Sequence, residues 1–202
     1  MKASGWDCSK APTTPCTKDG KPFPTLRLAT TSGNALRQNT IQVIQQDLAK
    51  VGIPITIDGQ LYPAGTFFGD YASGGILATG NYDLAEFAYV LGLDSDGNLY
   101  DAYHSSQIPT AADPAGTNYQ HLSDPKLDQM LESGRTTIDP AARSTIYKNV
   151  QEYMIDQQAY QVPLYIRPNI VLTDSLVGNY FSNPVSLGNE WNVGEWYRTK
   201  SA

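Results

Sequence analysis

The segment from residue 26 to residue 57 constrains the fold most strongly. Leu26–Thr30 alternates in polarity as a strand does, and Ile53–Ile57 does so again. Between them, the apolar residues of Leu36–Val51 fall mainly on one helical face, and Gly52 stands where a helix would end. A strand, a helix and a second strand with short connections predict a βαβ unit. Its two strands should pair in parallel through a right-handed crossover.

The rest of the chain predicts further α/β elements. Asn81–Val90 reads as a third strand, and a short amphipathic segment precedes it at Thr66–Ala72. Helices are predicted from Ser123-Asp124-Pro125 to about Gly134 and from Asp139-Pro140 to about Gln158, each with proline at an early helical position. Tyr160–Leu172 reads as one or two strands interrupted by prolines. The expected fold class is α/β, with a small mixed sheet flanked by helices.

The first 24 residues are irregular and contain both cysteines, Cys8 and Cys16, in a stretch rich in Pro, Thr and Lys. A metal site is not expected, because the chain has no second cysteine pair and its two histidines lie far downstream. A loop-closing disulfide is predicted, with two free surface thiols as the alternative. A disulfide implies an oxidising compartment. Since Met1–Trp6 has no apolar core of a signal peptide, we expect the chain to be part of a longer protein.

Composition excludes several classes of partner. The 202 residues carry a formal net charge of −6 and no local run of Lys or Arg. Nucleic acids and anionic membrane surfaces normally require a basic face, so neither is expected as a partner. No apolar stretch approaches the roughly 18 residues of a membrane-spanning helix.

The acidic segment Asp94–Asn98 is the main candidate for a binding site. Asp94 and Asp96 follow the predicted third strand, and open α/β sheets bind ligands at the carboxyl ends of strands. A carboxylate there can pair with a ligand ammonium group. An ordinary solvated turn is the alternative, because the same residues are typical of turns.

The same segment also suggests calcium, since oxygen ligands stand at alternate positions. Leu99 and Ser105, however, occupy the positions where a calcium-binding EF-hand loop has Gly and Glu. Neither His104 nor His121 stands in a sequence motif typical of a Ser or Cys nucleophile, so catalysis is not indicated. Tyr100 and Tyr119 are the tyrosines best placed to line a ligand groove.

Several motifs occur in one order along nearly the whole chain. They are Gly5-Trp6 with Asp19-Gly20-Lys21, the unit at 26–57, Tyr82-Asp83, Leu91–Asp96, Asn118-Tyr119 with Ser123–Leu131, Asp139…Arg143…Tyr147…Gln151, and Val162–Tyr165. In this order they resemble the C-terminal lobe of the peptide/nickel-type extracellular solute-binding proteins. The chain departs from that family in lacking an N-terminal lobe and in having Gly97 where the family often has proline.

The resemblance implies one lobe of a class II periplasmic-binding-protein fold. It implies residues 1–24 as an entry segment, 25–175 as the ligand-binding lobe and 176–202 as a tail that returns to a second lobe. The implied function is capture of a solute, expected to be a short peptide, by closure of a cleft and delivery to an ABC transporter membrane permease. Such a protein is an extracytoplasmic monomer without catalytic residues, cofactor or metal.

The resemblance also assigns one residue a role. By match, Asp94 pairs with the α-amino group of the ligand, and Asp96, Tyr100 and Tyr119 are expected beside it. The family binds peptides, nickel complexes, sugars and other solutes, so the resemblance leaves the ligand's identity open. A calcium-dependent surface module that uses Asp94–Asn98 is the alternative function.

Overall fold

A computed structural model describes residues 2–89, 92–166, 171–183 and 188–199 of the protein. The chain divides into two compact units, each made of two segments. The first unit comprises Met1–Ala88 and Asp101–Asp124, and the second comprises Tyr89–Tyr100 and Pro125–Ala202. The domain boundaries expected from the sequence stay a prediction.

The first unit is built around the strand β3 (Leu26–Thr31). Strand β4 (Ile55–Thr56) pairs with its beginning, β6 (Leu84–Ala85) with its middle and β5 (Leu61–Tyr62) with its end. All three pairings are parallel, which confirms the predicted βαβ unit. The sheet is therefore parallel rather than mixed, and the third strand is much shorter than predicted.

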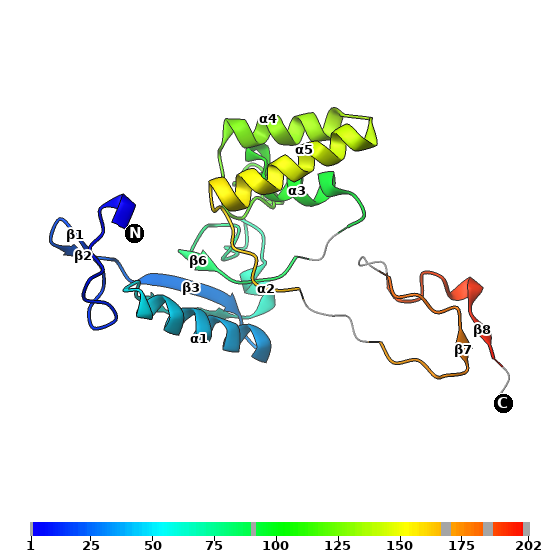
Figure 1. Ribbon diagram of the computed structural model, residues 1–202, viewed down its shortest axis with the longest axis horizontal. Coiled ribbons are helices and arrows are strands. Elements are labelled where there is room, and N and C mark those ends of the chain that lie inside the picture. Colours follow the sequence, from blue (N-terminus) through cyan, green and yellow to red (C-terminus); the bar gives the residue numbers. More distant parts are fainter. Residues whose placement is uncertain (1, 90–91, 167–170, 184–187, 200–202) are drawn as a thin grey trace. The chain divides into compact units, whose positions relative to one another are not determined.

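Helix α1 (Ala35–Lys50) covers one face of this sheet (Figure 1). It begins where the Asn34 side chain accepts a hydrogen bond from the Arg37 amide at 3.1 Å, a usual N-cap arrangement. On this face Leu28, Ile41 and Ile55 are buried together. The opposite face of β3 contributes Ala29 to a second cluster, whose other buried members are Phe67, Ile76 and Leu77. Alternate residues of one strand thus enter two cores.

The second unit contains the predicted helices. Helix α4 spans Pro125–Thr136, and α5 spans Pro140–Glu152 and continues as a π-helical turn to Gln157. Asp139 caps α5 by accepting from the Ala142 amide at 2.8 Å. Gly134 allows close packing of the two helices, since a Cβ there would lie 2.7 Å from the Tyr147 ring. Both helices therefore begin within one or two residues of their predicted starts.

The remaining elements are short. They are the helical turns η1 (Lys2–Ser4), α2 (Ala64–Phe67), η2 (Ser105–Gln107) and η4 (Val193–Glu195), the helix α3 (Ser95–Tyr103), and two antiparallel ribbons, β1 (Thr17–Lys18) with β2 (Lys21–Pro22) and β7 (Val177–Gly178) with β8 (Tyr197–Arg198). Of the described helices, none has the length and apolar character that crossing a bilayer requires.

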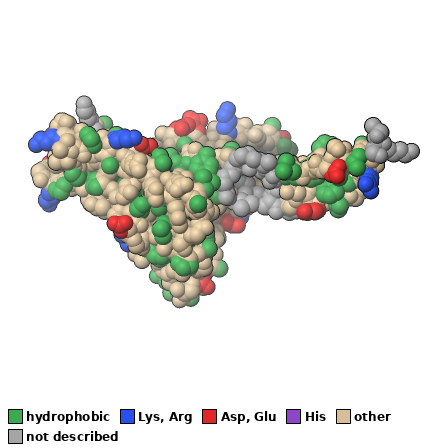
Figure 2. Space-filling view, turned by 90° about the horizontal axis from the view of Figure 1, so that it is seen from below, with side chains coloured by type: hydrophobic (Ala, Val, Ile, Leu, Met, Phe, Trp, Pro, Cys, Tyr) green, Lys and Arg blue, Asp and Glu red, His purple; other side chains and the backbone are tan. Residues whose placement is uncertain are grey.

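The strands predicted within Tyr160–Leu172 are absent from the residues described there; 167–170, which include Pro168, lie outside them. Val162, Ile166 and Leu172 are exposed at 74%, 94% and 93%, so their apolar side chains gain no burial from pairing. Other apolar groups also reach the surface, as the green atoms in Figure 2 illustrate. Apolar alternation alone was therefore a misleading strand signal here.

The cysteine loop is closed as predicted. Cys8 and Cys16 form a disulfide with their Cα atoms 4.3 Å apart, and Cys16 is fully buried. The Cys16 amide donates to the Gly52 carbonyl at 2.8 Å, which attaches the loop to the end of α1. Gly52 itself has a φ of +81°, and a Cβ there would lie 2.7 Å from the Cys16 sulfur. Only glycine fits this position without displacing the loop.

Breaking the disulfide should destabilise the chain. We expect Cys8→Ala to lower the free energy of unfolding by about 2–3 kcal/mol, the loop-closure entropy that so short a crosslink removes from the unfolded chain. Urea denaturation measures this difference. Reductant should lower the stability of the parent to that of the variant and leave the variant unchanged. Two titratable thiols in unreduced, denatured parent protein would contradict the assignment.

Gly52→Ala should be more damaging than the same change at Gly59. Both glycines have positive φ, +81° and +69°, but a Cβ at Gly59 meets nothing within 4 Å. Gly59→Ala should therefore cost only the left-handed backbone term, about 1 kcal/mol. Gly52→Ala adds overpacking against Cys16 and should cost about 2–4 kcal/mol. If urea denaturation shows that both variants lose the same free energy of unfolding, the contact between position 52 and Cys16 is not tight.

Candidate ligand-binding site

Asp94 and Asp96 lie at the start of helix α3 rather than in a loop. The Asp94 carboxylate accepts a hydrogen bond from the Asp96 amide at 2.9 Å, as an N-cap side chain does. Asp96 lies in the first turn, where the helix dipole stabilises negative charge. Capping thus makes the segment helical from Ser95, whereas the residue types in the sequence suggested a turn there.

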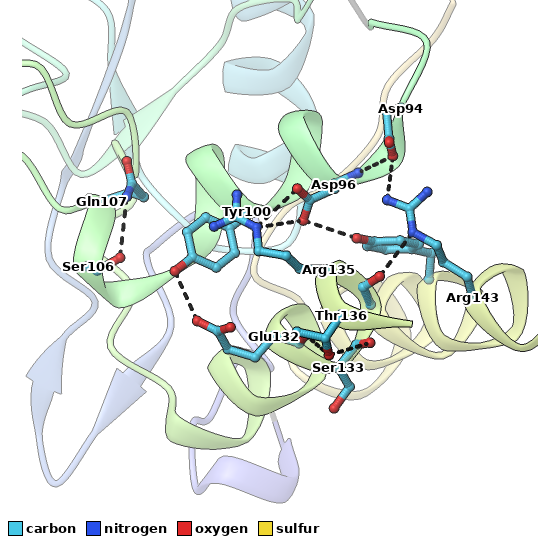
Figure 3. A network of polar contacts seen from close by, with 12 residues as sticks. Asp94, Asp96, Tyr100, Ser106, Gln107, Glu132, Ser133, Arg135, Thr136 and Arg143 are labelled. Carbon is cyan, nitrogen blue, oxygen red and sulfur yellow. Dashed lines mark hydrogen bonds and ion pairs between the residues drawn. The ribbon is translucent and has the colours of Figure 1, made fainter. Parts of the chain in front are cut away.

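Asp94 forms an ion pair with Arg143 of helix α5. The Arg143 Nη2 donates to Asp94 Oδ1 at 2.7 Å, and the Arg143 Nε donates to the Gly134 carbonyl at 3.0 Å (Figure 3). The hydrogen bond from Arg143 is the main reason why the pKa of Asp94 is lowered. The Asp94 side chain is still 59% exposed, and its Oδ2 has no partner among the described residues. One carboxylate oxygen is thus available to a ligand.

Asp96 is held more completely than Asp94. Both of its oxygens accept from the Arg135 Nε, at 3.1 and 3.3 Å, and the Tyr147 hydroxyl donates to Oδ1 at 3.2 Å. Arg135 also stacks on Tyr100, with its guanidinium carbon 3.4 Å from the ring centroid. The Tyr100 hydroxyl donates to Glu132 at 3.0 Å, and Tyr100 is only 8% exposed (Figure 3). These contacts tie α3 to α4 and α5.

A surface hollow of about 610 Å³ lies beside Asp94. It is lined by Leu93, Asp94, Ser95, Pro140, Arg143, Ser144, Tyr147, Lys148 and Gln151. Of the four residues predicted from the sequence to bind ligand, only Asp94 lines it. Arg143 and Tyr147 were noticed in the sequence only as members of a helix motif. Their spacing of four residues, which puts them on one helical face, is the signal that could have paired them with an acid.

Tyr119 belongs to the first unit, whereas the other three predicted residues belong to the second. Its ring meets Phe87 edge-on with centroids 6.5 Å apart, and its carbonyl accepts a hydrogen bond from the Tyr82 hydroxyl. Burial raises the pKa of Tyr119. Its neighbour Asn118 is fully buried and donates to the carbonyls of Tyr103, His104 and Leu122. The Asn-Tyr motif thus stabilises the fold, and a ligand role for Tyr119 stays a prediction.

Metal ligands do not gather in the described part of the chain: no group there has three His, Cys, Asp or Glu side chains placed around a common point. The carboxylates of Asp94 and Asp96 are directed to arginines instead. No observation of the structure therefore favours calcium at Asp94–Asn98.

Similarity to known proteins agrees with this geometry at the level of the fold. No family model matches the chain. The curated relatives and solved structures that the chain is similar to are nevertheless peptide- and nickel-type solute-binding proteins, which confirms the resemblance seen in the motifs. The fold is that of a fragment of a lobe of such a protein, so the predicted fold class is also confirmed.

Three proteins illustrate the match. The oligopeptide-binding protein AppA of Bacillus subtilis is 24% identical over 91% of this chain and 31% of its own length. Its structure in complex with a nonapeptide covers 98% of this chain, at 21% identity and a TM-score of 0.65. Di/tripeptide-binding protein 4 of Pseudomonas aeruginosa is 28% identical over 73% of the chain and 25% of its own length. The structure of NikZ from Campylobacter jejuni in complex with Ni(L-His) covers 98% of this chain and 37% of the NikZ chain. The two are 22% identical, with a TM-score of 0.65. The chain thus spans about a third or less of the curated relatives.

The ion pair between Asp94 and Arg143 should make stability depend on pH. Because folding lowers the pKa of Asp94, the stability from this pair is fully present above the unfolded pKa, near 3.9, and is lost as pH falls through the lower folded value. Arg143→Gln should therefore cost more stability at neutral pH than at about pH 2.5 in urea denaturation.

Lys148→Gln is the matched control. It removes the same charge from an exposed side chain of the same helix, about one turn further along, and Lys148 forms no ion pair with another described residue. Its cost should be small and nearly independent of pH in this range. If Arg143→Gln lowers the free energy of unfolding equally at both pH values, Arg143 does not stabilise the ionised Asp94 in the folded protein.

Proposed function

We propose that this chain is the solute-capture part of an ABC importer binding protein for short peptides. The observation that carries the proposal is the match to AppA, an oligopeptide-binding protein whose nonapeptide complex covers 98% of the chain. The di/tripeptide-binding relative supports the same class of solute. NikZ, in complex with Ni(L-His), represents the other solute class among the neighbours.

The proposal includes a location and partners. The disulfide suits an extracytoplasmic compartment, where such bonds persist. The solute would be enclosed between this lobe and a second one, then passed to a membrane permease. Binding by enclosure needs no covalent chemistry, since burial from two sides and a few polar contacts suffice. The proposal also takes the protein to act as a monomer.

Within this function, Asp94 is the proposed anchor for the α-amino group of a peptide. Its Oδ1 is held by Arg143 and the Asp96 amide, which fixes the carboxylate in one orientation. Its Oδ2 has no described partner and the side chain is exposed, so an ammonium group can approach. Asp96 and Tyr100 would then be supports, because their polar atoms already contact Arg135, Tyr147 and Glu132.

Asp94→Asn should weaken peptide binding by about tenfold or more in the intact protein that contains this chain, because it removes the charge that an ammonium group requires. Asparagine is also a good N-cap residue, so the ligand-free protein should lose only the small contribution of the exposed ion pair with Arg143. Calorimetric titration with an unmodified oligopeptide measures the effect.

Asp96→Asn is the matched comparison and should weaken binding less. N-acetylated peptide, which has no α-ammonium group, should bind the parent and the Asp94→Asn variant equally weakly. If the acetylated peptide binds the parent as tightly as the free peptide, Asp94 does not anchor an α-amino group.

A further inference from the structure

The carboxyl ends of β3 and β6 bring together two buried polar residues. Thr30 is the penultimate residue of β3, and Glu86 directly follows β6, which pairs with β3 in parallel. Thr30 is fully buried and Glu86 is 8% exposed. The carboxyl ends of parallel strands are where open α/β sheets bind ligands. This buried acid therefore lies at a position where ligand contacts are common.

Glu86 has few partners for a buried acid. The Thr30 hydroxyl lies 2.7 Å from the Glu86 carbonyl and 2.9 Å from the carboxylate Oε2, and its single hydrogen is shared between them. Within the described chain, no nitrogen of Lys, Arg or His forms an ion pair with Glu86. Oε1 has no partner among the described residues either, and the residue keeps 8% of its surface exposed.

Two arginines that contact residues in or beside β3 are bound to groups other than Glu86. Arg27, at the start of the strand, donates to the carboxylate of Asp83 at 3.1 Å. Arg37, in the first turn of α1, donates to the Thr31 hydroxyl at 2.7 Å. The fold therefore supplies cations to this strand without directing either of them to Glu86.

A carboxylate in this position costs stability in the free protein. Removing an ionised group from water is unfavourable unless charge pairing and hydrogen bonds replace the lost hydration. In Glu86, which is only 8% exposed, the shared hydroxyl hydrogen of Thr30 replaces little of the hydration that Oε2 loses. Glutamine would keep the shape and the bond from Thr30 without burying a charge. A ligand cation would supply the missing compensation through a charge-assisted bond.

We propose that Glu86, positioned by Thr30, binds a cationic group of the solute, an ammonium or a guanidinium. The site then prefers peptides that carry a Lys or Arg side chain. This inference rests on the proposed peptide-capture function and narrows its ligand. The proposed role of Glu86 does not depend on that of Asp94, because different residues position the two carboxylates: Thr30 for Glu86 and Arg143 for Asp94.

The test compares peptides that differ in one charge. Tripeptides of alanine with lysine at each position in turn are titrated calorimetrically into the intact protein, beside peptides with the uncharged isostere norleucine. We expect at least one lysine peptide to bind about tenfold or more tightly than its norleucine counterpart. In Glu86→Gln this preference should fall to about twofold or less, while the norleucine peptides bind as before.

Glu152→Gln is the matched control, because it removes the same charge from an exposed residue at the end of α5. It should keep the full lysine preference. Without ligand, Glu86→Gln should raise the melting temperature by about 2 °C or more, since it removes an uncompensated buried charge. Equal binding of the two peptide series, a preference that survives Glu86→Gln, or a lower melting temperature in that variant would overturn the inference.

Failure of the proposed function gives a different result. If no peptide binds the intact protein, peptide capture is wrong, and 1,5-diaminopentane then tests Glu86 alone. Chemical-shift changes at Thr30 and Glu86 with the diamine, but not with 1-pentanol, would support a cation site for a solute of another class. No shift with either probe would overturn the Glu86 site as well.

Discussion

Parallel pairing along β3 is the constraint on which the first unit depends. Three short strands bond to successive parts of β3, so its backbone groups are satisfied on both edges. Both of its faces must then be covered, and alternate residues supply both. Leu28 packs with Ile41 of α1, while Ala29 packs with Phe67 on the other side. The short connection through Gly52 and the crossover helix are what make the parallel arrangement possible.

The acids of this protein differ in how far the fold already satisfies them. Asp96 is bound by an arginine and a tyrosine, and Asp94 by an arginine and an amide, while Glu86 has part of one hydroxyl. Burial follows a different order, since Glu86 is buried whereas Asp94 is exposed. Exposure alone therefore does not tell which of these acids keeps an oxygen without a partner among the described residues.

The sequence predicted the helix ends well, because the residues that start and stop a helix lie within the same short segment. The proline and acid at Asp139-Pro140 begin α5, and Gly52 ends α1, because caps act within one helical turn. Strand predictions did less well. Within the described residues 81–89 only Leu84–Ala85 forms a strand, and the described part of Tyr160–Leu172 has none. Strand pairing needs a neighbour that no local pattern specifies.

The fold class, the βαβ unit and the disulfide could be predicted from the sequence, because each depends on residue types at short spacings. The family resemblance could be predicted as well, from the order of motifs along the chain. Asp94 and Asp96 were also recognisable as notable acids. Their contacts were not predictable, since Arg135 and Arg143 reach them from helices about forty to fifty residues away in the chain. The same holds for Glu86 and Thr30, which 56 residues separate and parallel strand pairing brings together. Such contacts are set by packing between distant segments, to which no local pattern is sensitive.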